Sequence, residues 1–591
     1  MAHQAIHSSG VGKSAMVYID YAVLSESLSD FGYSMPENDV LMNKVNTLAT
    51  EFNLTVDDFI DEVVASAVNM KKTEIDLGIL EHLEAELSKK LKRNLDRVLT
   101  PSSSTSRRVL GERHVNECSL NVSSMEMDTS SYEDFGSTQL TGKYRAFAPV
   151  ASSPSNAKYQ SRLQRNVVVR EMQGQMFVSS STVGGSVAVS VLSSIPSSLY
   201  AIDKPTNIID AKCGRLASFA SRCRQANPQV PSWSVPVPGS SSSEYVYGEI
   251  VRDLLDDLQL SDQCVSLLMD DEAGTVIELD LTRLPEVTIF PGQMVALLGS
   301  FENGNRFMAT HQFFPIPLPL STLGRPVNDE NLRLWCACGP FTSNDNCSYE
   351  QLCDLLEMVK QQQPHVLILM GPFVERKNAF MRSPQFPEQY ENVMDELMRK
   401  IALSLEGCRT ELIIQPAPFR DACSTCAFPT PPFKVCSDFC KKFGRRFHSV
   451  PEPCVVRING VELALTTSEI ISHLSKNEWH RSEDQENRDR IARLASHMLE
   501  QSSLYPLFPP ALPSSIEECI RICNLYSAPH VIVCPSVLAS FIKVVNKTVI
   551  VNPGTTARGG SGTFLRCEFG TSIVKDATDL PDCSRFEIVQ L

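Results

Sequence analysis

The sequence lacks any apolar run near 20 residues, the length that a helix needs to cross a bilayer, so we expect no membrane partner. Basic residues are in deficit, with 54 Lys and Arg against 69 Asp and Glu and a formal charge of −15. This balance argues against a protein that coats nucleic acid, although a local basic face is compatible with it. Aromatic residues are also few, at 7% of the chain. No fixed-period repeat indicates a solenoid.

Cysteine, by contrast, is plentiful. The 19 cysteines are odd in number and irregularly spaced, and the first residues contain no apolar stretch typical of a secretory signal. We therefore expect reduced thiols in the cytosol or nucleus rather than a disulfide framework. The 591 residues suggest about four structural units at roughly 150 residues per domain.

Four regions of the chain differ in pattern. Residues 1–98 carry apolar side chains at helical spacing and predict a small helical domain that docks a partner. Residues 99–185 are rich in Ser and Thr and predict a flexible linker, because they cannot bury enough apolar surface to offset their ordering entropy. Residues 186–320 read as short strands with turns, which predict a small β-barrel. Residues 321–591 alternate strands with helices, as α/β layers do.

Individual elements follow from the same patterns. We expect barrel strands at residues 245–251, 265–269, 275–281, 294–301 and 306–313. In the last region we expect strands at residues 332–338, 366–370, 411–414, 454–458, 461–466, 530–534 and 548–551. Helices are expected there at residues 349–362, 387–405, 488–501 and 537–545.

Two small motifs are candidates for metal binding or modification. A C-x2-C and a C-x3-C pair could together hold zinc tetrahedrally, and they comprise Cys423, Cys426, Cys436 and Cys440. Free thiols on a proline-rich surface loop explain the same residues, and we favour that interpretation, so we expect no cofactor. Thr100 and Ser153 each precede a proline in the predicted linker, where phosphorylation would add charge to an accessible segment.

The turns that follow the apolar strands are where α/β proteins place ligands and metals. Here those turns begin Gly339-Pro340 and Gly371-Pro372. A two-metal phosphoesterase would need Asp, His and Asn ligands at these strand ends. Proline and phenylalanine, which the sequence offers instead, carry no side-chain atom that binds a hard cation.

An ordered series of short blocks resembles the B-subunit family of the DNA polymerase alpha–primase complex. The blocks lie at residues 290–293, 337–342, 369–373, 431–433, 453–454, 458–461, 465–474, 505–510, 534–536, 551–554 and 562–564. The resemblance is specific over roughly residues 240–570, and the N-terminal regions match in layout only. It implies a multidomain α+β protein with an N-terminal helical bundle, a disordered linker, an OB-fold barrel and a calcineurin-like phosphoesterase fold that has lost its active site.

The residues at the expected metal-binding turns agree with the loss of the active site. In active relatives one metal-binding turn reads Gly-Asp-x-x-Asp, and here residues 371–375 keep only Glu375. A second turn corresponds to Phe419-Arg420-Asp421, where an arginine would repel a metal pair. His473 lies near a vestigial ligand position, although a histidine at a helix end or in the core is the commoner case. The degenerate positions are therefore Gly339, Pro340, Gly371, Pro372, Glu375, Phe419, Arg420, Asp421 and His473.

The resemblance implies a non-catalytic nuclear subunit. It would bind the C-terminal region of the polymerase alpha catalytic subunit, meet the primase subunits within the complex and recruit other replication factors through its N-terminal domain. The predicted barrel is acidic and poor in aromatic residues, so we expect protein binding there and only weak or indirect DNA contact. The alternatives are the equivalent accessory chain of polymerase delta or an active metallophosphoesterase with the ligands Asp345, Glu375, Asp421 and His473.

Overall fold

The computed structural model describes residues 21–87 and 153–591, with short gaps inside both ranges. The gaps of four or more residues are 180–186, 196–201, 238–241, 253–259, 302–305, 322–330, 483–488 and 571–578. The chain divides into two compact units, a smaller one within residues 1–148 and a larger one that contains Pro149–Leu591. Among the helices so described, none has both the length and the apolar character that a membrane span requires.

The smaller unit is helical, in agreement with the pattern of its sequence. Its helices are α1 (Tyr21–Asp30), α2 (Asp39–Glu51), α3 (Val56–Met70) and a further helical segment over residues 77–85. Asn38 caps α2 by accepting a hydrogen bond from the Val40 N–H. The apolar positions that recur at helical spacing, such as Val45, Val63 and Leu80, are fully buried between the helices. Burial of this shared apolar surface is what stabilises helices of this length.

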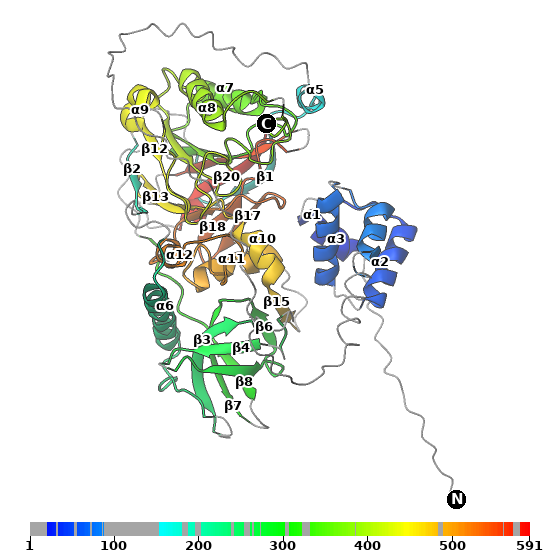
Figure 1. Ribbon diagram of the computed structural model, residues 1–591, viewed down its shortest axis with the longest axis vertical. Helices are drawn as coiled ribbons and strands as arrows, with labels where there is room; N and C mark the ends of the chain where they lie inside the picture. The colour runs from blue at the N-terminus through cyan, green and yellow to red at the C-terminus, as the bar shows by residue number, and fades with distance from the viewer. Residues whose placement is uncertain are drawn as a thin grey trace, which may run out of the picture. The chain divides into compact units, whose positions relative to one another are not determined.

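A closed five-stranded barrel forms one part of the larger unit (Figure 1). Its strands follow the order β3 (Glu244–Val251), β4 (Val265–Met269), β5 (Val276–Asp280), β8 (Arg306–Phe313) and β7 (Met294–Ser300). The pairs are antiparallel except for β5 with β8, which is parallel. The five strands expected in this region are therefore confirmed to within two residues at each end.

The rest of the larger unit contains two mixed sheets packed face to face. The seven-stranded sheet has the order β1 (Val167–Gln173), β20 (Ser584–Gln590), β19 (Thr563–Phe569), β9 (Leu332–Cys338), β10 (Val366–Met370), β11 (Glu411–Gln415) and β12 (Phe447–Ser449). The six-stranded sheet has the order β17 (Phe541–Val545), β18 (Thr548–Asn552), β16 (Val531–Val533), β14 (Val461–Leu465), β13 (Cys454–Ile458) and β2 (Val189–Val191). One buried apolar cluster takes side chains from both sheets, including Ile368 from one and Leu463 from the other.

Helices cover the outer sides of the paired sheets. The helices are α7 (Glu350–Gln362), α8 (Tyr390–Ser404), α9 (Ser437–Phe443), α10 (Ile470–Asn477), α11 (Arg490–Glu500) and α12 (Ile516–Cys523). Figure 1 shows the first three on one side of the sheets and the last three on the other. This layered arrangement agrees with the α/β pattern of residues 321–591. The parallel strands β9, β10 and β11 are mostly apolar because both of their faces are largely buried.

Residues 537–545 form no helix, so that prediction is wrong. The strand β17 occupies Phe541–Val545 and pairs with β18 in a hairpin. The two turn residues, Asn546 and Lys547, both have positive φ angles of 48° and 69°. Positive φ at both positions of a two-residue loop is the geometry of a tight hairpin turn. This turn and the β-branched residues before it determine the strand.

The linker predicted over residues 99–185 ends earlier than expected. Residues 88–152 lie outside the described part of the chain. Helix α5 (Pro154–Gln160) and strand β1 follow, and β1 pairs with β20 at the edge of the seven-stranded sheet. Strand β2, which lies in the range assigned to the barrel, instead pairs with β13. Both pairings join segments hundreds of residues apart, so no local pattern could reveal them.

Candidate functional site

The turns after β9, β10 and β11 lie together at one edge of the seven-stranded sheet, where the carboxyl ends of parallel strands meet. The Gly339 N–H donates to the Met370 carbonyl and the Gly371 N–H to the Gln415 carbonyl, each at 2.8 Å. A Cβ at Gly339 would lie 2.0 Å from the Pro372 carbonyl oxygen. Glycine is therefore required for this close backbone approach.

Asp421 is fully buried and holds two of these turns together. Its carboxylate accepts hydrogen bonds from the Phe373 N–H at 2.6 Å and from the Cys423 N–H at 3.2 Å. Burial raises the pKa of Asp421 to about 7, against the opposing effect of these N–H donors. Because its carboxylate is hydrogen-bonded to backbone N–H groups, Asp421 stabilises the conformation of the turns. The oxygen atoms that a metal would need are already engaged.

Arg420 lies between two carboxylates at the same strand ends. Its guanidinium is 3.4 Å from a Glu375 oxygen and 3.3 Å from a Glu469 oxygen. Glu469 also accepts hydrogen bonds from the Ser536 hydroxyl at 2.8 Å and from the Val537 N–H at 3.1 Å. Burial raises the pKa of Glu469, and the charge of Arg420 opposes that shift. The arginine thus neutralises the acidic groups that would otherwise attract a cation.

His473 lies on α10 and contacts a tyrosine. Its Nδ1 atom is 2.9 Å from the Tyr505 hydroxyl, and that hydroxyl accepts a hydrogen bond from the Ala511 N–H at 3.1 Å. The donor in this contact is set by the histidine tautomer, because the hydroxyl oxygen that accepts from Ala511 can also accept from a protonated Nδ1. Burial lowers the pKa of His473 to about 4, so the ring is neutral at pH 7. This environment is that of a packed histidine with one polar partner.

The ligand set of the enzyme alternative is not assembled. Asp345, its remaining member, accepts a hydrogen bond from the Ser155 N–H of α5 at 3.1 Å. In the part of the chain that the structure describes, no group of three or more His, Cys, Asp or Glu side chains is placed to hold a metal ion. At the carboxyl ends of the strands, the predicted residues therefore contact other protein groups, and Arg420 pairs with two carboxylates.

Of the four candidate zinc ligands, Cys423, Cys426 and Cys440 lie in the described part of the chain, where they form no metal-binding group. The Cys423 thiol donates to the Tyr390 carbonyl at 3.4 Å, and the Cys426 sulfur accepts from the Arg376 guanidinium at 2.7 Å. Cys440 is exposed on α9, and Cys436 lies outside the described residues. Thr100 lies outside them as well.

Ser153 is placed differently from the expectation of an accessible phosphorylation site. It is buried and caps α5 by accepting from the Asn156 N–H at 3.2 Å. Its hydroxyl oxygen also accepts from the Asn346 side chain at 2.9 Å. Phosphate added at this position would require the cap to open.

Sequence reasoning missed two buried carboxylates near the strand ends. Glu469 is the second partner of Arg420, and Glu452 accepts from the Thr466 hydroxyl at 2.8 Å and the Thr467 N–H at 2.7 Å. Burial raises the pKa of Glu452 to about 8, so the folded protein holds this group protonated at pH 7. The block over residues 465–474 contains Glu469, but its pairing depends on the loop geometry. A positive φ angle of 57° at Glu469 turns it toward Arg420.

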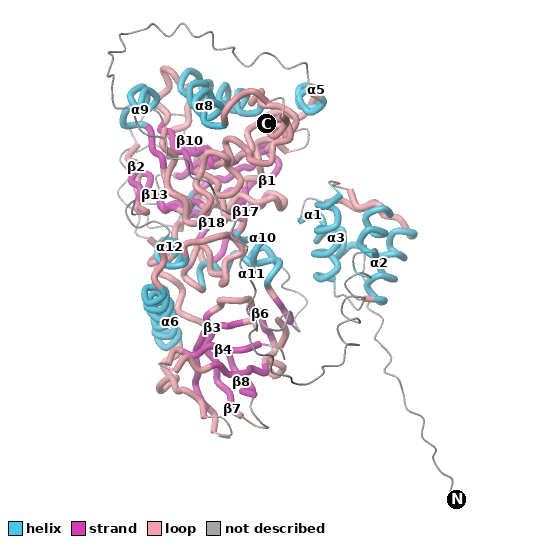
Figure 2. The backbone as a smooth tube through the Cα atoms, viewed as in Figure 1, coloured by secondary structure: helices cyan, strands magenta, loops and turns pink. Residues whose placement is uncertain are grey.

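Helix α6 (Pro205–Ala226) covers one side of the barrel (Figure 2). A buried cluster joins Leu216, Phe219 and Cys223 of the helix to Met294 and Phe313 of the barrel. Trp233 and two tyrosines of β3 pack against the same cluster. An OB-type barrel that binds single strands needs exposed aromatic residues for base stacking. Here Phe313 of the barrel belongs to the cluster that the helix forms, and Tyr245 and Tyr247 pack against it. The preference for protein partners stays a prediction.

The barrel is joined to the α/β layers through backbone and side-chain bonds. Strand β6 (Glu286–Ile289) pairs antiparallel with β15 (Trp479–Ser482). The Gln501 side chain accepts from the Met294 N–H at 2.7 Å and donates to the Met294 carbonyl at 3.0 Å. The Phe508 N–H donates to the Pro291 carbonyl at 3.0 Å. These bonds span the junction, and they make the barrel and the layers one compact unit.

A buried ion cluster reinforces the α/β side of this junction. Glu478 accepts from the Arg493 guanidinium at 3.1 and 3.2 Å and lies 2.9 Å from the His497 ring nitrogen. Burial alone would raise the pKa of Glu478, but the hydrogen bonds from His497 and Arg493 lower it to about 2. The His497 ring in turn lies 4.9 Å from the Phe290 ring beside the barrel. The charged cluster thus positions the aromatic contact across the junction.

Three family models match consecutive parts of the chain. They describe the N-terminal part of the DNA polymerase alpha B subunit over residues 23–90, the OB domain of the same B subunit over residues 227–314, and the DNA polymerase alpha/epsilon B subunit over residues 334–543. The OB-fold identity expected for the barrel is therefore confirmed, together with the mixed α+β organisation.

Curated relatives match over nearly the whole length. The DNA polymerase alpha B subunit of Caenorhabditis elegans is 34% identical over 557 residues, which cover 93% of this chain and 94% of the relative. The mouse protein of the same name is 28% identical, with 92% and 94% covered. The Saccharomyces cerevisiae protein is 26% identical over 56% of this chain and 54% of the relative. These names do not favour the delta alternative. The chain belongs to the family of DNA polymerase alpha B subunits, the accessory subunits of that polymerase.

Proposed function

We propose that this chain is a non-catalytic scaffold of the DNA polymerase alpha–primase complex. The observation that carries the non-catalytic part is Arg420, which lies within 3.4 Å of Glu375 and within 3.3 Å of Glu469. A two-metal phosphoesterase stabilises its transition state with cations held by such carboxylates. The Arg420 guanidinium neutralises the same carboxylates and offers no coordination position for substrate or water. The residues at the strand ends therefore stabilise the fold and do not catalyse a reaction in this proposal.

The larger unit has the calcineurin-like phosphoesterase fold in this proposal, without its chemistry. Two mixed sheets that pack face to face between helices support this assignment, as do the turns at the ends of β9, β10 and β11. Function resides in sites grafted on a fold, so the architecture alone carries no activity. The degenerate positions retain a structural role through close backbone packing at Gly339 and through the buried Asp421.

A joined barrel and α/β body is suited to binding a large partner. The bonds of Gln501 and the β6–β15 pairing hold the two parts in one arrangement, so binding does not have to order them first. We propose that this body binds the C-terminal region of the polymerase alpha catalytic subunit. The primase subunits join through the same complex. DNA contact by this chain is weak or indirect, and its place of action is the nucleus.

The smaller helical unit docks other replication-initiation factors in this proposal. It is a separate compact unit of short helices, which suits a docking module. Its attachment to the same chain raises the effective concentration of a bound factor near the polymerase. No cofactor is required for either role.

Phosphodiester hydrolysis tests the non-catalytic assignment directly. The full chain, free of copurifying polymerase, is incubated with a generic phosphodiester and Mn²⁺, beside an Asp421→Ala variant prepared in the same way. We expect no metal-dependent turnover above buffer from either protein. Turnover that requires Mn²⁺ and disappears in the variant would contradict the assignment, because it would show that the strand edge binds a catalytic metal.

A further inference from the structure

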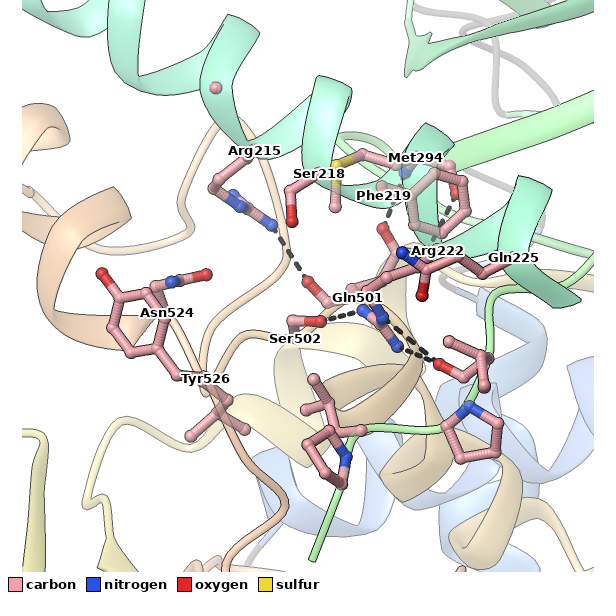
Figure 3. A pocket seen from close by; sticks show the side chains of 16 residues that line it. Arg215, Ser218, Phe219, Arg222, Gln225, Met294, Gln501, Ser502, Asn524 and Tyr526 are labelled. Carbon is pink, nitrogen blue, oxygen red and sulfur yellow. Dashed lines mark hydrogen bonds between the residues drawn. The ribbon is translucent and has the colours of Figure 1, made fainter. Parts of the chain in front are cut away.

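A pocket lies between α6, the start of β7, residues 316–319 after β8, and the segments that follow α11 and α12 (Figure 3). Its cavity volume of about 420 Å³ falls within the range of small-molecule sites. The wall contributed by α6 carries Arg215 and Arg222, and none of the 16 lining residues is Asp or Glu. In a chain with a formal charge of −15, this is a local positive site.

The two arginines differ in what they already bind. Arg222 is committed, because it donates to the Ile316 carbonyl at 2.8 and 3.2 Å and to the Ser502 hydroxyl. Arg215 makes one long hydrogen bond, 3.5 Å to the Gln501 carbonyl, and its Nε is buried with no partner. Figure 3 shows both side chains extending from α6 toward the residues that follow α11. Arg215 therefore has unused donors at the pocket.

The charge of Arg215 is also unpaired at short range. Among the residues that the structure describes, no carboxylate lies within 4.0 Å of either guanidinium. Glu249 is the acidic group that acts on Arg215, but its carboxylate pairs with Lys212 at 2.9 Å. Burial lowers the pKa of Arg215, as expected for a cation withdrawn from water without a full counter-charge. A bound anion would supply that counter-charge.

The rim of the pocket adds an aromatic surface. Tyr526 lines it and is 83% exposed, although a tyrosine of a folded protein usually buries most of its ring. Gln225 on α6 and Asn524 after α12 contribute amide groups to the pocket lining. A guanidinium fork matches a phosphate geometrically, and an exposed ring offers a stacking face for a base. We propose that the pocket binds a phosphate-bearing small molecule of mononucleotide size, with Arg215 contacting the phosphate and Tyr526 the base.

This inference goes beyond the scaffold role, and its test needs no polymerase. Binding of AMP and of inorganic phosphate to the full chain is measured by titration calorimetry at low ionic strength. Arg215→Gln is expected to weaken both ligands by about tenfold or more, because a charged hydrogen-bond donor is removed. Tyr526→Ala is expected to weaken AMP and leave phosphate unchanged. Arg224→Gln is the matched control on α6, since Arg224 bonds the Pro231 carbonyl away from the pocket.

Several results would overturn the proposal. Failure of AMP to bind saturably at millimolar concentration would do so, as would equal AMP binding by Arg215→Gln and the original chain. Equal weakening of AMP and phosphate by Tyr526→Ala would remove the assigned base contact. If Arg215→Gln does not fold, Arg215→Lys is used instead. It keeps the charge but lacks the fork, so weaker binding with an unchanged unfolding midpoint is expected, and unchanged affinity would count against Arg215.

Discussion

Removing the charge of Arg420 should destabilise the larger unit by a predictable amount. Each of its two ion pairs, at 3.3 and 3.4 Å, is worth about 5 kcal/mol of gross Coulomb energy at an effective dielectric constant of about 20. The guanidinium is 28% exposed and each carboxylate 15%, so desolvation and screening cancel much of that energy. We expect Arg420→Gln to lower the free energy of unfolding by about 2–3 kcal/mol at pH 8.

The pH dependence of this loss follows from Glu469. Burial already raises its pKa above the ordinary value of 4.5, and the charge of Arg420 limits the rise. Without Arg420 the folded-state pKa rises further, so the folded protein binds a proton that the unfolded chain releases. Stability is then retained below about pH 4.5 and lost as the pH increases toward the raised pKa. The deficit of Arg420→Gln should therefore be small at pH 5 and largest at pH 8.

Urea denaturation followed by tryptophan fluorescence measures this effect selectively. All 3 tryptophans of the chain, Trp233, Trp335 and Trp479, lie in the larger unit, so the signal reports on that unit alone. Arg399→Gln is the matched control, because Arg399 is an exposed residue on α8 whose ion pair spans three residues of one helix. It should change stability by less than about 0.5 kcal/mol. The reasoning is refuted if Arg420→Gln matches this control at pH 8.

Four further substitutions test neighbouring parts of the account by the same urea assay. Glu452→Gln should stabilise the protein by roughly 3–5 kcal/mol at pH 8 and by little at pH 5, because burial raises the pKa of Glu452 to about 8 and makes its ionised form costly in the folded protein. If the variant gains no stability at pH 8, the carboxyl is well solvated and the reasoning is wrong. Gly339→Ala should cost at least about 2 kcal/mol, since its Cβ would meet the Pro372 backbone, whereas Gly214→Ala in the open middle of α6 should stabilise slightly. Glu478→Gln should cost about 3–5 kcal/mol at pH 7 by leaving Arg493 without its counter-charge. Because the pKa of Glu478 is lowered to about 2, that cost should disappear as the pH falls from 4.5 toward 2, and a pH-independent cost would contradict the ion-cluster interpretation.

The parts of the fold that the sequence predicts well are those with local signals. Strands β9 and β10 are buried on both faces, so their apolar runs give their exact bounds. The barrel strands alternate apolar and polar side chains around turns and are equally readable. Strand β1 pairs with the last strand of the chain, and nothing in its own sequence points to that partner. Its Ser-rich surroundings therefore make it resemble a linker.

The strand-end site was predictable in its composition and unpredictable in its pairing. The motif predicts that Arg420 and Asp421 replace a metal-binding turn, and that assignment stays a prediction. Their contacts depend on the tertiary fold: Asp421 accepts a hydrogen bond from the Phe373 N–H, 48 residues away, and Arg420 pairs with Glu469, 49 residues away. Ser153 is a similar case, because its hydroxyl accepts from Asn346 across 193 residues. Spacing in one sequence cannot reveal such partners, which form only when the sheets pack.

Affinity purification with identification of partners by mass spectrometry tests the central claim most directly. The full chain and a chain that lacks residues 1–148 are compared, because α5 and β1 belong to the larger unit and must be retained. The account predicts that both forms recover the polymerase alpha catalytic subunit together with the primase subunits, and that only the full chain recovers additional replication factors. Failure of both folded forms to recover any polymerase subunit would contradict the scaffold role.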